Sequence, residues 1–212
     1  MYNIHMIKGK VNMDNYNEKL LELNKSRLYN NSKIVDKRKN VKKRLISSLI
    51  IISIIYIIVF IVGIFILKRQ NLKFEKDITF IVSFFLVMVF SFYIYPILHE
   101  IVHALVYPKK DRKIICKLGN FSYLTYCNAC ITKNRMILML IMPFLIFGIV
   151  QFIIWIFVIP FLNAGLAIGI YSSIIYIVFT CISDLGASYL VLTEVSKGAK
   201  VFMYGSELYY IE

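Results

Sequence analysis

Charged residues are scarce in this 212-residue chain, where they make up 17% of the sequence, while hydrophobic residues make up 59%. A soluble domain has about 25% charged and about 45–50% apolar residues. Together with a mean hydropathy of +0.70, this composition excludes a disordered chain, a coiled coil and an ordinary water-soluble globule. It favours a protein that resides in a lipid bilayer.

Acidic residues are rarer than basic ones, with 12 Asp and Glu against 25 Lys and Arg, and the net charge is +13. In a membrane protein such an excess reports topology and attraction to anionic lipid. Twelve of the basic residues lie within 1–44, most of them just before the first apolar run. That segment carries no nucleic-acid motif, so we expect the lipid bilayer and no specific nucleic acid as its partner.

Cysteine is sparse as well. The four cysteines do not form the disulfide framework of a small secreted domain. Cys127 and Cys130 make a lone C-x-x-C without a second pair, so we expect reduced thiols there and neither a structural zinc site nor a redox centre.

Long uncharged runs divide the rest of the chain. Residues 45–67 contain no charge, and neither do residues 136–183, which are long enough for two spans and are broken near Pro160, Asn163 and Gly165. A spanning helix needs about 20 apolar residues. The sequence therefore predicts four transmembrane helices, over 45–67, 78–107, 136–162 and 165–183.

The polar segments between these helices set the expected orientation. Residues 1–44 read as a basic tail, 108–135 as a loop with a β-hairpin, and 184–212 as a segment with β-prone pieces. The hairpin strands are expected over 113–118 and 121–129, with Gly119 and Asn120 as the turn. By the positive-inside rule both termini and the hairpin are cytoplasmic. The predicted fold is an all-α, multi-pass protein of the cell membrane, with about four transmembrane helices and a small cytoplasmic β-hairpin and β tail.

Histidine is the rarest of these residue types, with three in the chain, and two of the three form an H-E-x-x-H motif: His99, Glu100 and His103. Residues at i and i+4 share one face of a helix, so two imidazoles can bind one Zn²⁺. Glu100 lies beside them and can reach a water that the metal activates. Ionisable residues within a span are expensive and indicate function. The alternatives are side chains that simply mark the end of the span, and a metal or haem site without hydrolysis.

A catalytic zinc needs a third protein ligand. Asp184 is the first candidate because it follows a long uncharged run and lies at the membrane depth expected for the histidines. Glu194 is the second candidate but lies further into the cytosol, and His5 belongs to the N-terminal tail. The alternative for Asp184 is a helix-end charge or cap.

The chain resembles the small membrane-embedded zincin-like metallopeptidases, and more distantly it is similar to the site-2 protease class of intramembrane zinc proteases. The resemblance implies that His99 and His103 are zinc ligands, that Glu100 is the catalytic base and that Asp184 is the third ligand. The matching residues are His99, Glu100 and His103, the stretch 121–131 with Thr132-Lys133-Asn134-Arg135 and the Pro143 helix, and Ser183-Asp184-Leu185-Gly186.

These residues predict a membrane-embedded zinc metalloprotease, a metalloendopeptidase that hydrolyses membrane or membrane-proximal proteins. Its substrate would be presented as a strand added to the 109–135 hairpin. The main alternative is a non-catalytic membrane regulator or immunity-type protein that keeps the metal-binding fold, although such a protein has no need of Glu100. A transporter is a weaker alternative, since Gln151 is the one large polar side chain in the last two predicted helices.

Overall fold

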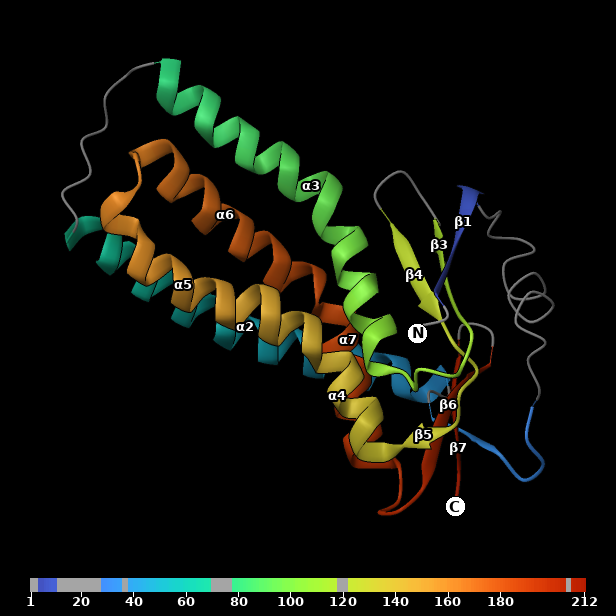
Figure 1. Ribbon diagram of the computed structural model, residues 1–212. Helices are drawn as coiled ribbons and strands as arrows, with labels where there is room; N and C mark the ends of the chain where they lie inside the picture. The colour runs from blue at the N-terminus through green and yellow to red at the C-terminus, as the bar shows by residue number, and fades with distance from the viewer. Residues whose placement is uncertain (1–3, 11–27, 36–37, 70–77, 118–121, 205–206) are drawn as a thin grey trace.

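The computed structural model describes residues 4–10, 28–35, 38–69, 78–117, 122–204 and 207–212. Long helices lie side by side, and short strands gather at one end of them, where the first and last strands also lie (Figure 1). The helical elements are α2 (Arg38–Arg69), α3 (Ile78–Val106), α4 (Lys133–Pro143), η2 (Phe144–Val150), α5 (Gln151–Val158), η3 (Ile159–Phe161), α6 (Ala164–Thr180) and α7 (Ile182–Glu194). The strands are β1 (Ile4–Lys10), β2 (Lys33–Ile34), β3 (Lys113–Lys117), β4 (Tyr123–Tyr126), β5 (Ile131–Thr132), β6 (Lys200–Tyr204) and β7 (Glu207–Ile211).

Two helical runs in the described part of the chain are long and apolar enough to cross a membrane: α3 and the run Lys133–Phe161. The pair of α6 and α7, which is bent by 42°, adds a third if it counts as one span. The chain is mostly helical with small sheets, as predicted. Four spans and the cytoplasmic position of the termini stay predictions.

Large apolar side chains cover the outside of the helices. Phe161 is 87% exposed, Phe157 and Ile78 are each 72% exposed, and Phe65 on α2 is 66% exposed. So much exposed apolar area is unfavourable in water, whereas hydrocarbon accommodates it at no cost. The exposed surface of α2, α3 and α5 therefore has the character of a lipid-facing surface.

Helices α3 and α6 approach each other closely because α6 carries glycines at the contact. A methyl group added at Gly165 would lie 2.1 Å from Ser83 Oγ and 2.5 Å from the Phe80 carbonyl oxygen. One added at Gly169 would lie 3.1 Å from Val87 Cβ. Small residues let helix backbones pack tightly in membranes, where dispersion rather than the hydrophobic effect holds helices together.

The third predicted helix, 136–162, begins earlier than expected and changes its winding. It starts at Lys133, where the hydroxyl of the N-cap residue Thr132 accepts from the Arg135 N–H. After Pro143, which lacks an N–H for the helix ladder, the chain continues as the π-helical η2 and then as α5. Such π-helical segments are rare and occur frequently at functional sites.

The fourth predicted helix, 165–183, does not end in an extended tail. It ends at Thr180, and after a bend at Cys181 the chain forms a further helix, α7. Most of α7 lies in the segment 184–212, which was predicted to follow the last helix. Asp184 thus lies in the first turn of α7. In the sequence, the charge of Asp184 ends an apolar run and so suggested the end of the helix. The chain is nevertheless helical beyond it, because α7 buries Leu185, Leu190 and Val191.

Two small sheets lie beside the helix ends. The predicted hairpin is present, with β3 and β4 antiparallel and Ile115 opposite Thr125; its expected turn at 119–120 lies outside the described residues. The N-terminal segment differs from a simple solvated tail, since β1 pairs in parallel with β3 and β2 pairs with β7. The strand orders are β1-β3-β4 and β2-β7-β6-β5.

We expect Gly165→Ala to destabilise the protein by about 1–3 kcal/mol, because the added methyl overlaps a backbone carbonyl that cannot move freely. The midpoint of thermal unfolding in detergent should fall. Phe179→Leu is the control, since Phe179 lies near the other end of α6 and is 62% exposed. An unchanged midpoint for Gly165→Ala would contradict the close α3–α6 contact.

Candidate metal centre

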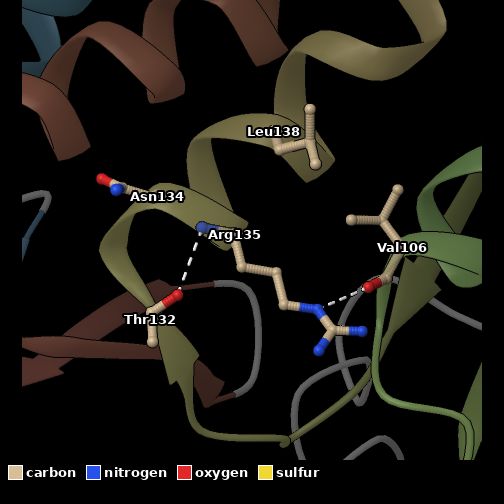
Figure 2. Close-up of a pocket in the computed structure, with 5 residues that line it drawn as sticks. All are labelled: Val106, Thr132, Asn134, Arg135 and Leu138. Carbon is tan, nitrogen blue, oxygen red and sulfur yellow. Dashed lines mark hydrogen bonds between the residues drawn. The ribbon is translucent and has the colours of Figure 1, made fainter.

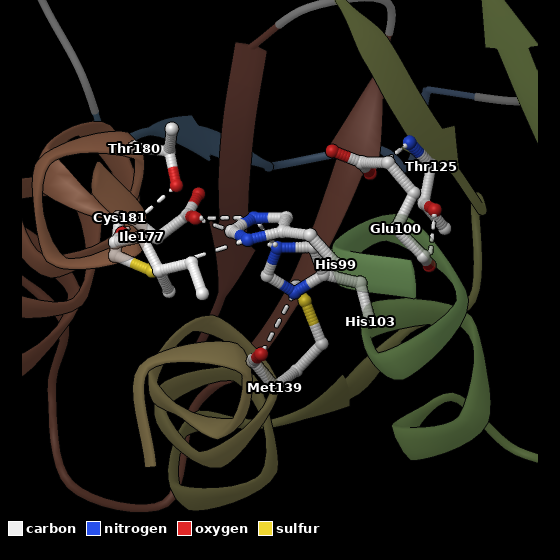
Figure 3. Close-up of polar contacts among 9 residues, drawn as sticks. His99, Glu100, His103, Thr125, Met139, Ile177, Thr180 and Cys181 are labelled. Carbon is white, nitrogen blue, oxygen red and sulfur yellow. Dashed lines mark hydrogen bonds and ion pairs between the residues drawn. The ribbon is translucent and has the colours of Figure 1, made fainter. Parts of the chain in front are cut away.

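The C-terminal part of α3 presents both motif histidines on one face. His99 and His103 are one helical turn apart, and their Nε2 atoms lie 3.0 Å from each other. The rings meet edge to face, with centroids 4.6 Å apart. Figure 3 shows both rings turned toward the side of the site where Ile177 and Cys181 lie. Two imidazole nitrogens therefore share one small space inside the helix bundle.

Asp184 enters this space from α7. Its Oδ2 lies 2.9 Å from His99 Nε2 and 3.5 Å from His103 Nε2, and its side chain is 18% exposed. The structure thus brings together His99, His103 and Asp184, which the sequence predicts to lie at the same membrane depth. The bend at Cys181 makes this possible, because it turns the first residues of α7 back toward the end of α3.

The three atoms have the spacing of ligands on one ion. Two ligand atoms bound to a tetrahedral zinc at 2.0–2.1 Å lie about 3.3 Å apart. The three separations here, 2.9, 3.0 and 3.5 Å, lie on both sides of that value. Two imidazoles and a carboxylate are also a donor set found at catalytic zinc sites. The residues present therefore fit a zinc ion with a fourth position left for water or substrate.

The orientation of His103 is set by its second nitrogen. Nδ1 lies 2.8 Å from the carbonyl oxygen of Met139 on α4, so it carries the proton, and Nε2 is left without one on the side of Asp184. Metal-binding histidines in proteins usually make such an outer contact. Met139 acts here through its main chain, so the sequence contains no sign of its role.

Glu100 lies beside the histidines but is held by the hairpin. Its Oε2 accepts a hydrogen bond of 2.6 Å from the main-chain N–H of Thr125 on β4. The hydroxyl of Thr125 donates to the Glu100 carbonyl oxygen, also at 2.6 Å. A carboxylate oxygen of Glu100 and a nitrogen of each histidine all lie within 4.8 Å of one another. Glu100 is thus close enough to act at the centre and is 9% exposed.

Two basic residues at the start of α4 hold the three helices of the site together. Arg135 Nε donates to the carbonyl oxygen of Val106 at the end of α3, at 2.8 Å (Figure 2). Lys133 Nζ donates to carbonyl oxygens near the end of α7, those of Leu192 at 2.8 Å and Val195 at 2.7 Å. These carbonyls have no partner within their own helices. Both charges therefore have structural partners within the fold.

The contact of Arg135 with Val106 borders a cavity of about 540 Å³, whose other lining residues are Thr132, Asn134 and Leu138. This cavity lies at the start of α4, and none of its lining residues belongs to the His–Glu–Asp group. Two other predicted candidates lie elsewhere. Glu194 is at the far end of α7, about 15 Å along the helix axis from Asp184. His5 lies in β1, opposite Ile114 of β3.

The C-x-x-C cysteines directly follow strand β4. Cys127 is fully buried, Cys130 is partly buried, and both are unpaired. Burial raises the pKa of the Cys127 thiol to about 11 and also raises the pKa of Cys130. Both thiols are therefore neutral near pH 7 in the metal-free protein, which disfavours a role as a nucleophile.

We expect maleimide to leave Cys127 unlabelled at pH 7.5 in the folded protein, since the reactive thiolate forms only as the pH approaches 11. All four cysteines should react after denaturation, which serves as the control. Replacing Cys127 and Cys130 together by alanine should leave the zinc content unchanged. Loss of zinc from that variant in its folded form would show that these two cysteines take part in metal binding.

Comparison with known proteins identifies one match. A family model with the description "Putative zincin peptidase" matches residues 92–199, about half of the chain. The matched part begins before His99 and contains the hairpin, α4 and Asp184. No curated protein and no solved structure matches the chain.

Proposed function

The chain belongs to this zincin peptidase family, and from that membership we propose that it is a membrane-embedded zinc metalloprotease that hydrolyses peptide bonds of membrane or membrane-proximal proteins. The observation that carries the proposal is the triangle of His99 Nε2, His103 Nε2 and Asp184 Oδ2, with separations of 2.9–3.5 Å. Glu100 next to this triangle favours an enzyme over a regulator that only retains the fold.

In this mechanism His99, His103 and Asp184 would hold a zinc ion. When bound, zinc would polarise the carbonyl of the scissile peptide and make a water acidic. Glu100 takes a proton from the attacking water and gives it to the leaving amine, as a general base and then a general acid. Its burial excludes bulk water from this proton transfer, and in the absence of substrate the Thr125 N–H holds one oxygen of its carboxylate in a defined place.

The position of the site bears on the substrate. The site lies where α3 contacts the hairpin and α4 packs against both α3 and α7, at the end of the helices that carries the strands (Figure 1). With the orientation expected from the basic flanking residues, that end faces the cytoplasm. An extended peptide from a membrane-proximal region would then reach the metal from the cytoplasmic side and pair with the hairpin.

The purified protein should bind about one zinc per chain. Alanine at His99, His103 or Asp184 should each lower the zinc affinity by at least tenfold, because each removes one of three ligands. Glu194→Ala is the matched control for Asp184→Ala, since Glu194 is an acidic residue of the same helix, α7, and lies outside the triangle. Metal analysis after dialysis measures the effect, and normal zinc binding by Asp184→Ala would exclude Asp184 as a ligand.

Glu100→Gln should keep the zinc and lower cleavage of a peptide by about 10²–10⁴-fold, because general acid–base catalysis contributes that much. The readout is the rate of cleavage with zinc content measured on the same sample. A wild-type protein that binds zinc but cleaves none of a broad peptide library would favour the non-catalytic regulator. Retained cleavage by Glu100→Gln would overturn the assignment of the base.

A further inference from the structure

Within the part of the sheet that the structure describes, no strand pairs with the outer edge of β4. In the described sheet β3 lies between β1 and β4, so the chain's own N-terminal strand already occupies the other edge of β3. The predicted strand addition to the hairpin is therefore restricted to the outer edge of β4. β4 contacts α3, and the N–H of its Thr125 reaches Glu100 on that helix.

The hydrogen-bonding groups on the outer edge of β4 follow from the register. Residues of an antiparallel strand point their main-chain groups alternately toward the partner strand and away from it. The N–H of Thr125 goes to Glu100 and not to β3, so Thr125 and its neighbour but one, Tyr123, face outward. An incoming strand would pair with these two residues.

A peptide docked on β4 and the carboxylate of Glu100 would thus compete for one donor, the N–H of Thr125. Glu100 Oε2 occupies the N–H of Thr125 at 2.6 Å, and a main-chain N–H provides one hydrogen. A peptide that pairs with β4 at Thr125 would place a carbonyl oxygen where this carboxylate oxygen now lies. Both acceptors cannot use the donor fully at the same time.

We propose that the N–H of Thr125 is a shared donor that restrains Glu100 while the edge of β4 is empty and passes to a substrate carbonyl when an extended peptide docks there. Thr125 is then a positioning residue that couples docking of the peptide to release of the base. The inference rests on the proposed function, and it adds the docking edge and the contact through which docking acts on the site.

Two features of the contact fit an exchange. The hydroxyl of Thr125 donates separately to the Glu100 carbonyl oxygen, so β4 stays attached to α3 while its N–H changes partner. The released carboxylate also remains near its place of action, because one of its oxygens already lies within 4.8 Å of a nitrogen of each histidine. Glu100 therefore needs only a side-chain movement.

The test compares the peptide affinity of two inactive, zinc-loaded variants of the full chain. The probe is a fluorescein-labelled peptide of eight alternating valine and glutamate residues, chosen because the 109–135 segment has seven Lys or Arg and one Asp. Glu100→Ala removes the competing acceptor, whereas Glu100→Gln retains a side-chain oxygen that can still accept from Thr125. Fluorescence anisotropy in detergent measures both dissociation constants.

We expect Glu100→Ala to bind the peptide about fivefold more tightly than Glu100→Gln, the range of one neutral hydrogen bond. Adding Thr125→Pro, which removes the N–H on an edge where proline is tolerated, should abolish the difference. Adding Thr125→Ala, which keeps the N–H, should preserve it. Equal affinities of the two Glu100 variants, a difference that persists with Thr125→Pro, or no binding by any variant would overturn the proposal.

A Thr125→Pro protein that fails to fold would be recognised by its lost zinc, and amide hydrogen exchange then replaces it. The Thr125 amide should exchange more slowly in Glu100→Gln than in Glu100→Ala, and equal rates would overturn the proposal. The proposed function fails separately, if the wild-type protein binds no zinc or cleaves nothing. The affinity comparison uses inactive variants, so its result does not depend on cleavage.

Discussion

The convergence of three side-chain atoms from two helices is the constraint on which the rest of this structure depends. His99 and His103 come from α3 and Asp184 from α7, and the atoms lie 2.9–3.5 Å apart in a mostly buried space. Unpaired polar groups at such a depth are costly, so each of the three needs the other two or a metal. The helices must therefore hold their positions to within fractions of an ångström.

Several features of the fold serve that requirement. The glycines of α6 bring it against α3, the bend at Cys181 turns α7 toward the site, and α4 lies between α3 and α7. Lys133 and Arg135 bond from the start of α4 to the ends of both other helices. The Met139 carbonyl oxygen then orients His103. Contacts that look merely structural thus support the geometry of the centre.

The hairpin contributes to the site by holding Glu100. It contributes none of the three clustered atoms, yet Thr125 bonds to Glu100 through both its main chain and its hydroxyl. The β-prone character of 121–129 predicted the strand, and the H-E-x-x-H spacing predicted the base. Neither pattern could predict that the two touch, because that contact joins segments 25 residues apart through a main-chain N–H that every residue except proline possesses.

The sequence by itself determined the helical membrane character, the hairpin and the motif, because apolar runs, strand alternation and i, i+4 spacing are local properties. It also favoured Asp184 over Glu194, since Asp184 borders the apolar run and Glu194 lies about three helical turns beyond it. Only the tertiary structure decided that α7 follows α6 as a separate helix, that β1 occupies one edge of the hairpin, and that Met139 and Thr125 orient the site. Those features depend on packing and main-chain hydrogen bonds between distant segments, which leave no local signal in the sequence.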